Sequence, residues 1–201
     1  MNSNFWDRTE SRQGLALPLN EKIILFGAAR VDDPIKGFDI FLEALQCLII
    51  KGIYKKEELH LVTFGNFKYS EKVIPHIPVS HTDMGWIKEY RILSQLYSAA
   101  DIVVSSSFYE TFGQTLIEAQ SCGCVPVSFG NSGQTDIIQH KINGYLAEYL
   151  SVKSLASGIQ WGLENGKHIN RESLREEVIN KYSSDIVAKE YIGLYQRLMR
   201  K

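Results

Sequence analysis

Short, continuous apolar runs recur along this chain and alternate with segments of helical periodicity. The clearest runs are KIILFG (22–27), LHLVTFG (59–65) and DIVVSS (101–106), and none shows the in–out alternation of a half-exposed strand. Continuous apolar strands separated by helices are typical of a parallel sheet that is covered on both faces. The pattern therefore predicts an α/β fold with a doubly wound parallel sheet, Rossmann-like in its layers.

The remaining elements follow from the same two periods. The predicted strands cover 22–27, 59–65, 76–85, 101–106, 124–130 and 144–148, and the predicted helices cover 37–52, 88–98, 113–122, 151–164, 171–181 and 183–201. Asn170 is a candidate N-cap for the helix over 171–181. The last helix carries an apolar stripe, which we expect to pack against this domain or another part of the protein, with a partner's groove as the alternative. The stripe consists of Val187, Tyr191, Leu194, Tyr195 and Leu198.

The first twenty residues differ in character from the rest of the chain. Residues 1–20 are polar and turn-rich without a clean period, and an apolar strand begins abruptly after them. Such a segment is typical of a linker or of the entry to a domain. We therefore expect residues 1–20 to be an interdomain linker remnant and residues 21–201 to form one domain, the size of which is ordinary for a single core.

Charge and cysteine content exclude several classes of function. There are 22 basic and 23 acidic residues, so no general field attracts nucleic acid. The odd number of cysteines, 3, indicates a reducing compartment, and no apolar run is long enough to span a bilayer. We expect a cytoplasmic protein, with peripheral attachment to the inner membrane face as an alternative in the full-length protein. Cys122 and Cys124 are predicted to lie in a tightly packed turn, because a C-x-C without a second pair is a weak metal signal.

The loops at the carboxyl ends of the strands are the candidates for a binding site, because ligands of open parallel sheets bind beyond those ends. Four of these five loops begin with glycine, which allows a ligand to approach the backbone closely. None contains the G-x-G-x-x-G of dinucleotide enzymes or the G-x-x-x-x-G-K-[ST] phosphate loop. The commonest nucleotide enzymes of this fold class are therefore excluded.

The first loop, 27–37, instead carries two cations, Arg30 and Lys36. A guanidinium fork and a compact ammonium together could hold a diphosphate. The alternative is two solvated surface cations, with Arg30 paired to Asp32 or Asp33. The residues themselves leave both interpretations open.

Two glutamates, Glu110 and Glu118, stand on either side of 111-TFGQ-114. On one continuous helix, residues eight positions apart differ by about 12 Å in height and could not meet at one small group. Gly113 and the end of the predicted strand near Ser106 instead indicate that residues 107–112 form a loop and that a helix begins near 113. The backbone amides of Gly113, Gln114 and Thr115 would then form an anion site at the helix start, with one acid on either side of it.

These residues resemble a known family. The stretches GAAR (27–30) with Lys36 and Gly37, LYSAADIVVSSSFYETFGQTLIEAQSCGCVPV (96–127) and GQTDIIQHKINGYLAE (133–148) are similar to the C-terminal, donor-binding half of the retaining GT-B glycosyltransferases, group 1 or family 4 type. The E-x7-E signature is specific when it is embedded in E-x-F-G-x-x-x-x-E-A and followed by G-x-P-V, as it is here. The resemblance extends over about 20–165.

The resemblance implies a role for each matching residue. Arg30 and Lys36 match the basic pair that holds the donor diphosphate and stabilises the leaving group. Glu110 matches the residue at the donor sugar, and Glu118 matches the acceptor of ribose hydroxyl hydrogen bonds. The resemblance thus gives Arg30, Lys36 and Glu110 as the candidate catalytic residues. The donor-binding candidates are Glu118, Gly27, Trp86, Ile87, Phe112, Gly113, Gln114 and Thr115.

Two positions depart from the family pattern. The VDDPI segment between Arg30 and Lys36 is longer than usual, which bears on the role of Arg30. The loop 130–136 has Ser132 and Asp136 where the family often has a glycine and a glutamate, which bears on the sugar pocket.

The resemblance further implies a nucleotide-sugar donor, no metal or other cofactor, and an N-terminal domain of similar size that binds a sugar or lipid-linked acceptor. The chain is then expected to be an excised donor domain that is inactive alone, and polysaccharide biosynthesis is the family's common use. Two alternatives remain. One is a nucleotide-sugar epimerase of the same architecture, and the other is a non-catalytic nucleotide or carbohydrate binding module.

Overall fold

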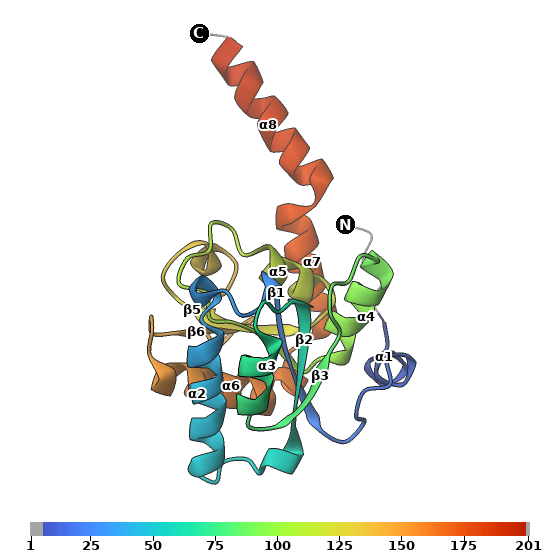
Figure 1. Cartoon of the computed structure of the whole chain (residues 1–201). Coiled ribbons are helices and arrows are strands. Elements are labelled where there is room, and N and C mark those ends of the chain that lie inside the picture. Colours follow the sequence, from blue (N-terminus) through green and yellow to red (C-terminus); the bar gives the residue numbers. More distant parts are fainter. Residues whose placement is uncertain (1–5, 200–201) are drawn as a thin grey trace.

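A single six-stranded parallel sheet forms the centre of the protein (Figure 1). The computed structural model describes residues 6–199. The strands are β1 (Lys22–Arg30), β2 (Leu59–Asn66), β3 (Ser80–Asp83), β4 (Ile102–Ser105), β5 (Val125–Phe129) and β6 (Tyr145–Ala147). They lie in the order β3-β2-β1-β4-β5-β6, and every neighbouring pair is parallel. The predicted doubly wound sheet is confirmed, and the third strand is shorter than the predicted 76–85.

Helices cover both faces of the sheet. The α-helices are α1 (Arg8–Gly14), α2 (Phe38–Ile50), α3 (Ser70–Val73), α4 (Tyr90–Ala99), α5 (Gln114–Ser121), α6 (Val152–Asn165), α7 (Arg171–Tyr182) and α8 (Ser184–Met199). Short 3₁₀ helices are η1 (Pro34–Lys36), η2 (Lys56–Glu58), η3 (Ile74–His76), η4 (Gly133–Asp136) and η5 (Gly166–His168). The predicted cap of α7 is confirmed, since Asn170 accepts hydrogen bonds from the amides of Glu172 and Ser173.

The central strand β1 contributes to two separate apolar cores. Ile24 and Phe26 pack with α2 and α6 on one face, and Ile23 and Leu25 pack with α4 and α5 on the other. All four side chains are buried. Because successive residues of a strand point to opposite faces, a strand that is covered on both faces must be apolar at every position. This explains why the run KIILFG does not alternate.

The strand order places the crevice for a ligand. From β1 the chain continues to β2 and β3 on one side of the sheet, and it then returns to β4 on the other side of β1. The loops after β1 and β4 therefore leave the sheet in opposite directions. At such a switch point a crevice opens beyond the carboxyl ends of the two strands.

Part of the predicted linker over 1–20 is folded onto the domain. Residues 8–14 form α1, and Arg12 is buried against the end of α4. Its guanidinium donates to the carbonyl of Ala99 at 2.9 Å and forms an ion pair of 2.8 Å with Asp101. The polar composition of this segment thus reflects buried ionic contacts in addition to solvent exposure. The division at residue 20 stays a prediction.

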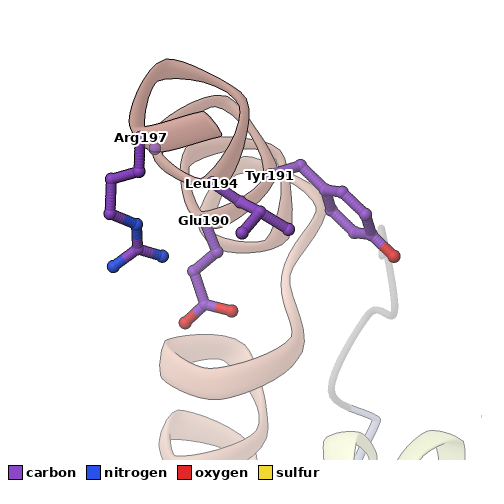
Figure 2. A pocket seen from close by; sticks show the side chains of 5 residues that line it. Glu190, Tyr191, Leu194 and Arg197 are labelled. Carbon is purple, nitrogen blue, oxygen red and sulfur yellow. The ribbon is translucent and has the colours of Figure 1, made fainter. Parts of the chain in front are cut away.

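Helix α8 extends away from the body of the domain (Figure 1). Of the two predicted surfaces for its apolar stripe, this domain is ruled out, because none of the described residues of α8 is buried, and another part of the protein stays a prediction. Tyr191, Leu194, Tyr195 and Leu198 are 42–60% exposed. The same helix borders an open hollow of about 830 Å³ (Figure 2), and all the residues that line it belong to α8. A helical period alone could not show which surface, if any, the stripe meets.

The turn after α5 is tightly packed, as predicted for its two cysteines. Cys122 and Cys124 are buried, and both are free thiols. Burial raises the pKa of Cys122 to about 11 and that of Cys124 to about 12. Thiols with such pKa values are poor nucleophiles and poor metal ligands at neutral pH. These cysteines are therefore part of the core.

Candidate functional site

The loops after β1 and β4 meet at the switch point. The ammonium of Lys36 lies 3.3 Å from Oε1 of Glu110, and both side chains are mostly buried. The hydroxyl of Ser106 donates to the carbonyl of Gly37 at 2.7 Å and lies 3.1 Å from that of Lys36. The amide of Phe108 donates to the carbonyl of Ile35. Residues that are about seventy positions apart in the sequence are thus held in one rigid junction.

Gly37 makes this close approach possible. Its φ is +61°, a left-handed conformation that L-residues seldom adopt. A Cβ at this position would collide with the carbonyl oxygen of Ser106 and would touch the ring of Phe108. The glycine between Lys36 and α2 is therefore required by the contact between the two loops.

Arg30 is engaged by its own loop. Its guanidinium forms an ion pair of 2.8 Å with Asp33 and lies 3.9 Å from Asp32. Asp32 in turn accepts hydrogen bonds from the backbone amides of Lys68 and Tyr69. The longer segment between Arg30 and Lys36 thus supplies carboxylates that pair with Arg30 and anchor the loop after β2. Of the two cations, Lys36 is the one that contacts a predicted site residue.

The predicted junction between loop and helix is present at Gly113. This residue is the N-cap of α5 with φ +80°, and α5 begins at Gln114. Glycine has no side chain with which to cap the helix, and the first amides of a helix have no acceptor within the helix. The amides of Gln114 and Thr115 therefore lie at the positive end of α5, where an anion is favoured. Glu110 lies in the loop before this point and Glu118 in the helix after it.

Glu118 is half-buried and held by two side chains. The hydroxyl of Tyr97 donates to Oε2 of Glu118 at 3.0 Å, and the side-chain amide of Gln114 donates to Oε1 at 3.1 Å. Burial raises the pKa of the Glu118 carboxyl, and the hydrogen bonds from Tyr97 and Gln114 oppose this rise. A carboxylate in such a position can accept further hydrogen bonds from a ligand. It is not an exposed helix acid.

The loop of Glu110 is tied to the loop after β5. The hydroxyl of Ser132 accepts a hydrogen bond from the amide of Glu110 at 3.2 Å and donates to Oε1 of Gln134 at 2.5 Å. The amide of Gly133 donates to the carbonyl of Glu110 at 3.0 Å. Ser132, a departure from the family pattern, therefore contributes a side-chain contact that glycine could not make.

The other predicted donor-binding residues lie in different surroundings. Trp86 is 54% exposed and Phe112 is 51% exposed, whereas Ile87 is partly buried against the core. The ring of Phe112 packs edge-on against Tyr182 at 5.5 Å. The space beside Gly27 is filled by the ring of Phe64. Packing thus accounts for the glycine at position 27, and its donor-binding role stays a prediction.

Ser106 and Tyr97 of the site were not singled out by the sequence, and Ser132 was noted only as a departure from the family pattern. Ser106 and Ser132 join loops through their hydroxyls, and nothing local distinguishes them from other loop serines. Tyr97 carries a weak signal, because the hydroxyl of a buried tyrosine commonly has a hydrogen-bond partner. Which partner it finds depends on the packing of α4 beside α5.

A comparison with known families identifies the chain. A model described as glycosyl transferases group 1 matches residues 7–181. The chain belongs to this family. The match covers all the elements from α1 through most of α7, and with them every predicted site residue of this glycosyltransferase domain.

Individual relatives agree with this assignment. An uncharacterized glycosyltransferase of Methanocaldococcus jannaschii is 27% identical over 207 residues, which cover 99% of this chain and 51% of the relative. A D-inositol 3-phosphate glycosyltransferase of Xylanimonas cellulosilytica is 31% identical over 158 residues, 70% of this chain and 34% of the relative. The chain thus spans about half or less of the length of these relatives.

The fold agrees with solved glycosyltransferases of the GT-B architecture. A sucrose-phosphate synthase of Thermosynechococcus elongatus superposes with a TM-score of 0.80 at 24% identity, over 98% of this chain and 50% of that structure. At this identity the likeness concerns the fold. It confirms the predicted Rossmann-like layers of a GT-B domain.

The protonation of Glu118 gives a testable consequence for stability. Its pKa in the folded state is raised, so the folded protein binds this proton more tightly than the unfolded chain does. The contribution of Glu118 to stability must therefore fall as pH rises through its pKa. We expect the stability of the Glu118→Gln variant, which has no such titration, to rise relative to that of the wild type as pH increases from about 4, near the ordinary pKa of a glutamate, to about 8. Urea unfolding at both pH values measures this, and a difference between the two proteins that is independent of pH would contradict it.

Proposed function

We propose that this chain is the donor-binding half of a retaining hexosyltransferase and that it binds a nucleoside-diphosphate sugar. The single observation that carries the proposal is the junction at the switch point. There Lys36 contacts Glu110 at 3.3 Å, and Glu110 lies three residues before Gly113, the N-cap of α5. A cation and a helix N-terminus favour a diphosphate, and the flanking carboxylates can accept hydrogen bonds from sugar hydroxyls.

In this arrangement each group has a separate task. Lys36 and the first amides of α5 stabilise the negative charge of the departing diphosphate, Glu118 holds the ribose, and Glu110 holds the donor sugar. The bond from the anomeric carbon to the diphosphate oxygen breaks, and a bond to an acceptor oxygen forms on the same face. The proton of the acceptor hydroxyl passes to the departing diphosphate. No step requires a metal.

The acceptor and the second half of the cleft are proposed to come from another domain of the same protein. The chain covers 51% of the Methanocaldococcus relative, which leaves room for a domain of similar size. We therefore expect the chain alone to bind nucleotides and not to transfer sugars, because half of the site is absent. No helix within residues 6–199 is long and apolar enough to cross a membrane. A cytoplasmic location, with peripheral membrane contact in the full-length protein, remains a proposal.

The binding preference for diphosphates tests the proposal. UDP, GDP and ADP and their monophosphates are titrated by calorimetry. At least one diphosphate should bind at least about tenfold more tightly than its monophosphate, since the second phosphate adds charge-assisted hydrogen bonds. Inorganic pyrophosphate serves as the control for anion binding alone and should bind more weakly than that nucleotide. Equal affinity for the di- and monophosphate of all three bases would overturn the assignment.

A further inference from the structure

We propose that Tyr97 is a positioning residue that fixes the carboxylate of Glu118 in the orientation required to hold a ribose. The inference rests on the proposed function, and it adds a residue outside the loops that form the site. Tyr97 lies on α4, and its hydroxyl donates to Oε2 of Glu118 on α5 at 3.0 Å. Gln114 holds the other oxygen at 3.1 Å.

Tyr97 is well suited to fix another side chain because it cannot move easily itself. It is 1% exposed and is among the largest fully buried side chains of the described residues. Its ring packs edge-on against that of Phe64 at 5.8 Å, and the ring of Phe64 fills the space beside Gly27. A packed series of side chains thus runs from Gly27 in β1 through Phe64 and Tyr97 to Glu118. The hydroxyl at its end donates to Glu118.

The two partners of Glu118 differ in rigidity. Gln114 is exposed, and it is the first residue of α5, so its side-chain amide can turn away when a ligand arrives. Tyr97 is enclosed and cannot. When a ribose binds, we infer that the bond from Tyr97 to Oε2 persists while Oε1 accepts from the ribose hydroxyls. The carboxylate enters the complex already oriented, which lowers the entropic cost of binding.

A cycle that combines a variant with a modified ligand isolates this role. The ligand is whichever of UDP, GDP and ADP binds best, together with its 2′,3′-dideoxy form, and the variant is Tyr97→Phe. In the wild type the dideoxy form should bind at least about tenfold more weakly than the unmodified diphosphate, because Glu118 loses both hydroxyl partners. The ratio of the two dissociation constants, that of the dideoxy form divided by that of the unmodified diphosphate, should fall by at least about threefold in the Tyr97→Phe variant. The affinity for the dideoxy form itself should change by less than about twofold. General damage to the domain would instead weaken both ligands equally and leave the ratio unchanged, which would overturn the inference.

Tyr54→Phe is the matched control. Tyr54 is also buried, and its hydroxyl has no hydrogen-bond partner among the described residues. Removing that hydroxyl should leave both affinities unchanged. A change in the ratio equal to that of Tyr97→Phe would contradict a specific role for Tyr97.

A crystal structure of the wild-type chain with the bound nucleoside diphosphate provides an independent test if the variant does not fold. The bond from Tyr97 to Oε2 should remain, with the ribose hydroxyls at Oε1. A Tyr97 hydroxyl turned away from Glu118 would overturn the inference. If none of the three diphosphates binds the wild type, the proposed function fails and this inference fails with it. Binding of a diphosphate with an unchanged ratio rejects the role of Tyr97 alone.

Discussion

Replacing Lys36 with alanine is expected to weaken the binding of the best nucleoside diphosphate about a hundredfold. The ammonium is the cation that the structure places against Glu110, at 3.3 Å, and Glu110 lies three residues before the N-cap of α5. Loss of one charge-assisted contact in a partly enclosed site costs about 2–3 kcal/mol, which corresponds to this factor. Removing the cation also leaves the carboxylate of Glu110 without its partner, and that charge would repel the diphosphate. Isothermal titration of both proteins measures the effect.

The Arg30→Ala variant tests whether the loss of affinity is specific to Lys36. The guanidinium of Arg30 is already paired with Asp33 at 2.8 Å and must leave that carboxylate to reach a phosphate. We therefore expect a loss of less than about tenfold. A larger loss for Arg30→Ala than for Lys36→Ala would mean that the diphosphate lies on the other side of the first loop. Lys72→Ala, in α3, should leave binding unchanged.

Replacing Gly37 with alanine is expected to destabilise the fold by about 3 kcal/mol and to reduce nucleotide binding as well. A left-handed φ of +61° costs an alanine about 1 kcal/mol. The remainder comes from the collision of the new methyl group with the carbonyl oxygen of Ser106, which forces the loops after β1 and β4 apart. The separation would move Lys36 away from Glu110. Chemical denaturation and calorimetry measure the two effects.

Gly52→Ala separates the two causes. Gly52 follows α2 with φ +67°, so it has nearly the same backbone strain, but no atom lies within 4 Å of the position of an added Cβ. This variant should lose only about 1 kcal/mol and should keep its affinity for nucleotide. If both variants lose the same stability, the contact with Ser106 contributes nothing, and the role of Gly37 is limited to its conformation.

Much of the fold could be read from local pattern. Each strand apart from β3 was predicted within about three residues, because a strand buried on both faces must be apolar at every position. The start of α5 was predicted from Gly113 and from the end of the preceding strand near Ser106, since glycine is among the residues accepted at a helix N-cap. The short strand β3 and α1 were not predicted well. At these places polar residues such as Arg12 take part in buried contacts that local pattern cannot reveal.

The candidate site divides in the same way. The residue types that could hold a nucleotide-sugar, and the loops that carry them, were identified in the sequence, because parallel strands bring their carboxyl ends to one edge of the sheet. The partners of those residues were not. The pairing of Arg30 with Asp33 was one of two open alternatives, and the choice between them depends on side-chain positions within the loop.

What the sequence by itself determined is the class of fold, the family and the set of loops at which a ligand can bind. These depend on periodicity and on motifs whose residues are close together in the chain. Only the tertiary structure decided that Lys36 faces Glu110, that Tyr97 holds Glu118 and that the stripe of α8 is left without a surface within residues 6–199. Each of these facts depends on how separate elements pack. The free energy of such contacts comes from distance and burial, which no short stretch of sequence encodes.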